Sequence, residues 1–259
     1  MSINIGISPK PLQLVDVTMN SRITPVKPID SFCSRWDVLL NSYKNKSLEN
    51  NNNSNKNNNG TQISNSKALV TIVIVGGGAG GAELAFAIKY RLKCEIEKQT
   101  IIDKDFKVIL ISRGKSILPN HCTSVQKIIS RLLLEKDIEL ILSTEIIDLN
   151  INSFHGKKIL KSIDGREFLC DEVIWCTQAC GQKWKQDNSS SNLSYDDDGF
   201  ILINSTLQSI TCPNIFAVGD ICHNVTHPRA KAGVFAVRAG PPLLQNIRHY
   251  LAKEPLEEW

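Results

Sequence analysis

The chain has 259 residues, of which 42% are apolar, so it is long enough for one large domain or two small ones. Its formal net charge is only +4, and its lysines and arginines are scattered, which argues against nucleic-acid binding. No apolar run has the length of a membrane span, and the first ten residues lack the pattern of a signal peptide. We therefore expect a cytoplasmic or organellar protein whose eight cysteines are free thiols.

The N-terminal region precedes the first strongly apolar segment. Residues 1–29 contain four prolines and predict extended chain and turns. Residues 31–43 predict a short helix, with Ser31 as its N-cap and one apolar face. Residues 48–66 are almost entirely asparagine, serine and lysine, which predicts a disordered insert because little apolar surface is available to offset the entropy of ordering. The alternative for this tract is a docking segment.

A glycine-rich turn follows, and it is the most informative motif of the chain. Residues 68–75 predict a buried strand, and residues 82–91 predict a helix. Between them, Gly76, Gly78 and Gly81 fit the pattern G-x-G-x-x-G in the strand–turn–helix context of a dinucleotide fingerprint. The first glycine permits a tight turn, the second admits a pyrophosphate and the third lets the helix pack closely on the strand. The alternative is a glycine-rich turn with a purely structural role.

The segments that follow predict an α/β domain of the Rossmann type with a β-meander insertion. Strand, helix and strand are expected in that order at 106–112, 124–135 and 138–142. A three-stranded meander is expected at 146–151, 157–163 and 167–169, with Asp164 and Gly165 at a hairpin turn. Further strands are expected at 172–176, 199–204 and 214–220. The C-terminal region predicts a helix at 230–240, then a kink at Pro241 and Pro242, and an amphipathic stretch at 243–251.

Several motifs together resemble the pyridine nucleotide-disulfide oxidoreductase superfamily. The turn GGGAGGAE is similar to its NAD(P)H-binding fingerprint, and TLQSITCPNIFAVGDIC at 206–222 is similar to its second FAD motif. The segment VIWCTQA at 173–179 lies where the family has an ATG turn. The resemblance is greatest to the branch of type II NADH dehydrogenases. Within that branch, INIGISP, PVKPID and PRAKAGVFAVRAGPPLLQNIRHYL resemble the oxidoreductase fused to or encoded beside selenide, water dikinase (selenophosphate synthetase).

This resemblance implies a flavoprotein with two Rossmann-like dinucleotide-binding domains. Residues 1–47 would be part of the FAD domain with a linker helix, 48–66 the insert, 67–179 the NAD(P)H-binding domain and 180–259 the returning FAD-domain segment. The implied cofactors are FAD and NAD(P)H, with hydride passing from the nicotinamide to the flavin and on to an unknown acceptor. The implied partners are these nucleotides, with a functional link to selenophosphate synthetase.

Three departures from the family pattern affect what we expect. The first G-x-G-x-x-G of the family, which holds the ADP part of FAD, has no counterpart, so the fold is expected to be N-terminally incomplete and to bind FAD weakly. Gln178 replaces the glycine of the ATG turn and would crowd the cofactor. Residues 233–240 lack the glutamines that quinone-reducing relatives place near the flavin, which argues against quinone reduction.

Candidate residues for the nicotinamide dinucleotide lie beside the fingerprint. The resemblance places Glu83 on the nicotinamide side, whereas its alternative role is to favour the helix dipole. Ser112 and Arg113 follow the second strand, where NAD-specific folds carry an acidic residue that binds the ribose 2′-OH. Arg113 would instead bind the 2′-phosphate of NADPH; its alternative is an ordinary surface arginine.

Candidate residues for FAD lie in the C-terminal region. Gly219 and Asp220 end the FAVGD motif, and the Asp220 carboxylate would accept a hydrogen bond from the cofactor or serve as a helix N-cap. Lys231, Ala232 and Gly233 would offer backbone N–H groups to the flavin. No metal site is expected, because the histidines and cysteines lack ligand spacing, and no side chain is assigned as a catalytic acid or base. The alternative function is a non-catalytic nucleotide-binding or interaction module.

Overall fold

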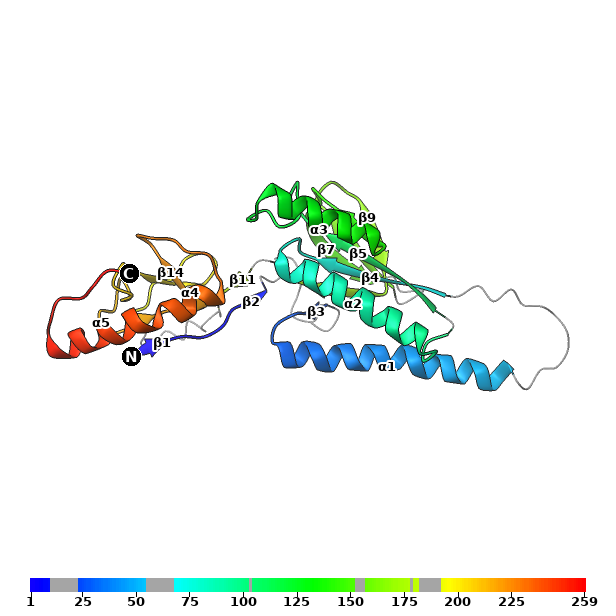
Figure 1. Cartoon of the computed structure of the whole chain (residues 1–259), viewed down its shortest axis with the longest axis horizontal. Helices are drawn as coiled ribbons and strands as arrows, with labels where there is room; N and C mark the ends of the chain where they lie inside the picture. Colours follow the sequence, from blue (N-terminus) through cyan, green and yellow to red (C-terminus); the bar gives the residue numbers. More distant parts are fainter. Residues whose placement is uncertain (10–22, 55–67, 103, 152–156, 178, 182–191) are drawn as a thin grey trace. The chain divides into compact units, whose positions relative to one another are not determined.

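The computed structural model describes residues 1–9, 23–54, 68–102, 104–151, 157–177, 179–181 and 192–259 (Figure 1). The chain forms two compact units, each of which is described by itself. Unit 1 contains Met1–Lys10 and Ala179–Trp259, and unit 2 contains Pro11–Gln178. Gln178 itself lies outside the described residues.

Unit 2 is built on a five-stranded parallel sheet with strand order β3-β10-β4-β5-β6. The strands are β3 (Thr24–Pro25), β10 (Glu172–Trp175), β4 (Ala68–Val75), β5 (Lys104–Ile111) and β6 (Ile138–Ile141). After β4 the chain moves outward through β5 to β6, and it then returns to pair β10 on the other side of β4. The strand order therefore reverses beside β4, which is where open α/β sheets bind their ligands.

The two faces of this sheet are covered by different structures. Along β4, Ile72 and Ile74 pack into a core with the helices, whereas Val73 and Val75 pack into a core with the meander. This alternation follows from the two-residue period of a strand. The helices are α1 (Ile29–Ser54), α2 (Ala79–Glu97) and α3 (Thr123–Glu135), and the meander strands are β7 (Ile146–Ile151), β8 (Lys158–Ser162) and β9 (Glu167–Cys170). The predicted α/β class and the β-meander insertion are confirmed.

Helix α1 differs most from its prediction. It was expected at 31–43 but runs from Ile29 to Ser54, so the first residues of the asparagine-rich tract continue the helix; residues 55–66 lie outside the described part. No proline or glycine interrupts the sequence before Gly60, so no strong stop signal ends the helix earlier. The helix also belongs to unit 2 rather than to the segment 1–47 with which it was grouped. The reason is that Tyr43 packs edge-on against Phe106 of β5, with ring centroids 5.4 Å apart.

Unit 1 consists of short strand pairs and two helices around a separate core. The pairs are β1 (Ser2–Ile3) with β13 (Phe216–Ala217), β2 (Ser8–Pro9) with β11 (Ala179–Cys180), and β12 (Ile201–Ile203) with β14 (Cys222–Asn224). A 3₁₀ turn, η2 (Gly219–Ile221), follows β13. Helix α4 (Gly233–Arg238) lies within the helix expected at 230–240. Helix α5 (Gly240–Ala252) covers the amphipathic stretch expected at 243–251, and the two prolines fall in its first turn.

A buried carboxylate near the C-terminal end of α2 connects this helix to α1. It lies at the opposite end of α2 from the glycine turn. Glu95 is only 3% exposed, and its carboxylate contacts Lys44 of α1 and Arg91 of α2 at 2.9 Å each. It also accepts a hydrogen bond of 2.6 Å from the Thr100 hydroxyl. The hydrogen bonds from Thr100 and Lys44 hold the pKa of Glu95 below its ordinary value. Glu95 therefore stabilises unit 2 in its charged form.

Replacing Glu95 by glutamine should lower the free energy of unfolding by about 2 kcal/mol, because two cations lose a buried partner. Since the pKa of Glu95 is depressed in the folded state, its contribution is present above the unfolded-state pKa of about 4.3 and is lost as the pH falls through the folded-state pKa. Urea unfolding at pH 7 measures the loss. The control is Glu97→Gln, whose ion pair with Lys93 is exposed and should contribute less than about 1 kcal/mol. Equal losses in the two variants would contradict this role.

Candidate dinucleotide-binding site

The turn after β4 is shaped by contacts that exclude side chains. Gly76 has a φ of +132°, which only glycine adopts readily, and a Cβ there would overlap the carbonyl oxygen of Cys176. Its N–H donates to the Ile111 carbonyl at 2.8 Å. A Cβ on Gly81 would overlap the carbonyl oxygen of Gly76, so the helix packs directly on the turn. Gly76 and Gly81 are therefore both required by the backbone packing.

Gly78 differs from these two glycines because its surroundings are open. A Cβ on Gly78 would meet no atom within 4 Å, and its φ of −79° is accessible to any residue. Gly78, Ala79 and Gly80 are all exposed. The space beside Gly78 is therefore available to a ligand that approaches the backbone closely.

The N-terminus of α2 lies at the same place. Gly78 is the N-cap and makes no side-chain capping bond, and the first helical bond runs from the Ala82 N–H to the Gly78 carbonyl at 3.1 Å. Among the described residues, none accepts a hydrogen bond from the N–H groups of Ala79, Gly80 or Gly81. N–H groups without an acceptor among the described residues and the positive end of a 19-residue helix favour an anion at the carboxyl edge of the sheet.

Ser112 and Arg113 lie at the end of β5, next to this turn. Ser112 is buried, and its hydroxyl accepts a hydrogen bond from the Gly114 N–H at 3.3 Å. A Cβ on Gly77 would overlap that hydroxyl, so Gly77 is a third glycine required by the packing. The run of three glycines was the only signal in the sequence for this contact. Arg113 is exposed.

Glu83 is exposed on α2, just beyond its first turn. The pKa of the Cys176 thiol is raised, mainly by burial and further by the negative charge of Glu83. The Cys176 sulfur lies 3.2 Å from the position that a Cβ on Gly80 would take. The end of β10 and the first turns of α2 therefore meet at one place, and the raised pKa favours the protonated Cys176 thiol there.

In unit 1, Gly219 and Asp220 form the turn after β13. Gly219 has a φ of +76°, and a Cβ there would crowd the side-chain oxygen of Asn4. The N-cap of η2 is Val218, so Asp220 does not serve as the cap. The Asp220 carboxylate is half-buried, and no residue in the described parts of the chain donates a hydrogen bond to it. It can therefore accept one from a ligand hydroxyl.

Lys231, Ala232 and Gly233 precede α4, with Ala232 as its N-cap. The Lys231 ammonium is engaged inside unit 1, since it lies 3.9 Å from the centre of the Phe200 ring and donates to the Cys222 carbonyl. Burial lowers the pKa of Lys231 and raises that of the neighbouring Cys222 thiol to about 11. A Cβ on Gly233 would meet nothing within 4 Å. A small pocket includes Gly219, Asp220, Lys231 and Ala232 in its lining.

The two groups of candidate residues lie in different units. The first consists of Gly76, Gly78, Gly81, Glu83 and Arg113, and the second of Gly219, Asp220, Lys231, Ala232 and Gly233. Within the parts of the chain that the structure describes, no three His, Cys, Asp or Glu side chains gather as a metal site would require. None of the described helices is both long and apolar enough to cross a membrane.

Comparison with known proteins finds one matching family model, a similar protein and a similar solved structure. The family model described as pyridine nucleotide-disulphide oxidoreductase matches residues 38–242. Ferroptosis suppressor protein 1 of Taeniopygia guttata is 30% identical over an alignment of 164 residues, and the match covers 59% of this chain and 41% of the relative. An engineered water-forming NADPH oxidase, solved with NADPH bound, has a TM-score of 0.51 at 20% identity over 73% of this chain and 38% of its own. The chain thus spans about two-fifths of the length of these two relatives. Because the family model matches most of the chain, the chain belongs to the pyridine nucleotide-disulphide oxidoreductase family.

Proposed function

We propose that unit 2 binds a nicotinamide dinucleotide, NADH or NADPH, with its pyrophosphate at the N-terminus of α2. The observation that carries this proposal is the open space beside Gly78, next to three backbone N–H groups that lack an acceptor among the described residues. Gly76 and Gly81 keep the strand end and the helix close together, and Gly78 admits the phosphates. The site lies where the strand order reverses, as this class of ligand requires.

For the whole protein, we propose an FAD-dependent oxidoreductase that uses NAD(P)H and passes electrons to an acceptor that these residues do not identify. Enzymes of this family use FAD and NAD(P)H. Hydride transfer between the nicotinamide and flavin rings is the chemistry that the two cofactors supply when bound. The protein residues then have to bind and orient the cofactors and exclude water, and no side chain is needed as an acid or base.

Unit 1 offers residues that fit the flavin nucleotide. The Asp220 carboxylate is half-buried without a hydrogen-bond donor among the described residues, which suits it to a hydroxyl of the ribityl chain. The backbone of Gly219 and of residues 231–233 would lie near the same ligand. We therefore propose that residues 67–179 form the NAD(P)H-binding part and that residues 180–259, with the first ten residues, belong to the FAD-binding part.

Two further expectations stay predictions. The functional link to selenide, water dikinase depends on the resemblance of sequence alone, and the cytoplasmic or organellar location depends on the composition of the sequence. The engineered oxidase, which was solved with NADPH, supports a nicotinamide dinucleotide as ligand, but it does not identify the electron acceptor of this chain.

The absorption spectrum of the purified protein tests the flavin part of the proposal. Because this chain is expected to bind FAD weakly, the protein is purified with added FAD; a flavin spectrum that NADH or NADPH bleaches without oxygen is then the expected result. A colourless protein that still binds NAD(P)H would instead favour a non-catalytic nucleotide-binding module.

A pair of glycine variants tests the dinucleotide site itself. Gly78→Ala should weaken NAD(P)H binding at least tenfold, because a methyl group would occupy the space meant for the pyrophosphate, while costing less than about 1 kcal/mol of stability. Gly81→Ala should lower the free energy of unfolding by about 1–3 kcal/mol, because its Cβ overlaps the Gly76 carbonyl. Calorimetric titration and urea unfolding measure the two effects. Unchanged affinity in Gly78→Ala would argue against the site.

Arg113 tests the choice between the two dinucleotides. With an arginine rather than a carboxylate after β5, we expect NADPH to bind at least as tightly as NADH. Arg113→Ala should lower NADPH affinity roughly tenfold more than NADH affinity, since a charge-assisted contact contributes about 1.5–3 kcal/mol. The control is Arg131→Ala on the exposed face of α3. If the wild type prefers NADH, or if Arg113→Ala leaves the ratio of affinities unchanged, Arg113 does not read the 2′-phosphate.

A further inference from the structure

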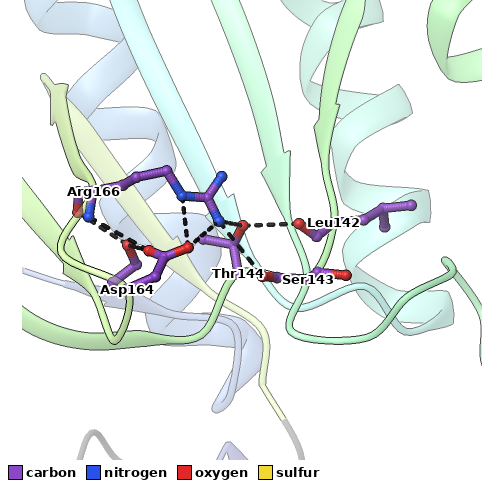
Figure 2. Close-up of polar contacts among 6 residues, drawn as sticks. Leu142, Ser143, Thr144, Asp164 and Arg166 are labelled. Carbon is purple, nitrogen blue, oxygen red and sulfur yellow. Dashed lines mark hydrogen bonds and ion pairs between the residues drawn. The ribbon is translucent and has the colours of Figure 1, made fainter.

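A polar network connects the meander to the carboxyl edge of the parallel sheet (Figure 2). Arg166 follows the turn between β8 and β9, and its side chain pairs with Asp164 of the same turn at 2.7 Å and 2.9 Å. The Ser162 hydroxyl donates to the other carboxylate oxygen of Asp164. The Arg166 guanidinium holds the pKa of Asp164 well below its ordinary value, so the pair stays charged at neutral pH.

The same guanidinium reaches out of the meander to the loop between β6 and β7. It donates to the Thr144 hydroxyl at 2.7 Å and to the Ser143 carbonyl at 3.5 Å (Figure 2). The Thr144 hydroxyl in turn donates to the Leu142 carbonyl at 2.9 Å, which leaves its lone pairs to accept from Arg166. Thr144 is only 2% exposed, so its hydroxyl depends on these partners rather than on water.

The loop that Arg166 contacts holds the segment on which Arg113 lies. The Thr144 N–H donates to the Ser112 carbonyl at 3.0 Å, and the Ser143 N–H donates to the Gly114 carbonyl at 2.9 Å. Arg113 is therefore fixed on both sides by the two residues that Arg166 contacts. Within the described parts of the chain, no other side chain of the meander donates a hydrogen bond to residues 142–144.

The geometry points to Arg166 as a positioning residue for the adenosine end of the dinucleotide. It would set the backbone path of residues 112–114 through Ser143 and Thr144, and thereby the place of the group that reads the ribose 2′ position. This inference rests on the proposed dinucleotide site. Asp164 orients the guanidinium, and an ion pair that is half-exposed contributes little to stability by itself. The Arg166–Asp164 pair therefore acts by orientation, because a planar guanidinium holds several acceptors in one geometry.

The test compares Arg166→Ala, Arg166→Lys and the matched control Lys161→Ala. Lys161 pairs with Glu167 across the same two strands, but this ion pair does not include residues 142–144. Titration calorimetry gives the affinities for NADH and NADPH. We expect Arg166→Ala to weaken NADPH binding about tenfold, to weaken NADH binding less, and to keep the wild-type melting temperature within a few degrees. Arg166→Lys should recover part of the loss, and Lys161→Ala should match the wild type.

A second variant keeps the inference testable if Arg166→Ala fails to fold. Thr144→Val removes the hydroxyl that accepts from Arg166 and keeps the side-chain shape, so it should change the ratio of NADPH to NADH affinity in the same direction. The effects of Arg166→Ala and Thr144→Val should not add in the double variant, because both break one contact.

The outcomes separate this inference from the proposed function. If the wild type binds dinucleotide and Gly78→Ala does not, while Arg166→Ala and Thr144→Val leave the ratio of affinities unchanged, Arg166 has no positioning role. An equal loss for both dinucleotides in the two variants would also overturn it. If the wild type binds neither dinucleotide, the proposed function fails, and the role of Arg166 fails with it.

Discussion

The structure of unit 2 depends on the direct contact between the turn after β4 and the first turn of α2. A Cβ on Gly81 would overlap the Gly76 carbonyl, so only hydrogen atoms separate the helix from the strand end. Two further strands approach the same run of glycines, since the Cys176 carbonyl excludes a side chain at Gly76 and Ser112 excludes one at Gly77. The ends of β4, β5 and β10 thus converge on backbone that carries no side chains. The unpaired N–H groups of α2 lie there as a consequence of this packing.

The two faces of the parallel sheet of unit 2 pack against different structures, and each packing affects the carboxyl edge of the sheet in its own way. On one face, α1, α2 and α3 bury apolar side chains against Ile72 and Ile74, which fixes the direction in which the N-terminus of α2 points. On the other face, the meander buries Leu149 and Leu160 against the alternate residues of the same strands. The meander also extends a charged turn to the carboxyl edge of the sheet, where Arg166 contacts Thr144. An insertion that closes the core can therefore also shape the edge of the sheet at which the candidate site lies.

Local patterns predicted the parts of the fold that local chemistry determines. The strand, glycine turn and helix from Ala68 to Glu97 were expected from β-branched residues, glycine spacing and helical periodicity, and the structure has them in that order. The packing of α1 against the parallel sheet was not predictable in this way, because it depends on distant contacts such as that between Tyr43 and Phe106. The contacts of Arg166 with Thr144 and of Ser112 with Gly77 were equally hidden. They join residues whose proximity depends on strand register, which a single sequence does not reveal.

The candidate sites of the two units differ in the chemistry of the groups that they offer to a ligand. At the N-terminus of α2, the donors are backbone N–H groups and a helix dipole, which favour the negative charge of a pyrophosphate. At Asp220, the group is a carboxylate acceptor, which would repel a phosphate and favours a neutral hydroxyl. A nucleotide at Asp220 would therefore need other residues to hold its phosphates, and the carboxylate would contact a hydroxyl of its sugar or ribityl part. If the proposed function holds, the fingerprint of unit 2 would therefore contact the phosphates of its nucleotide, whereas the FAVGD turn of unit 1 would contact a hydroxyl-bearing part of its own.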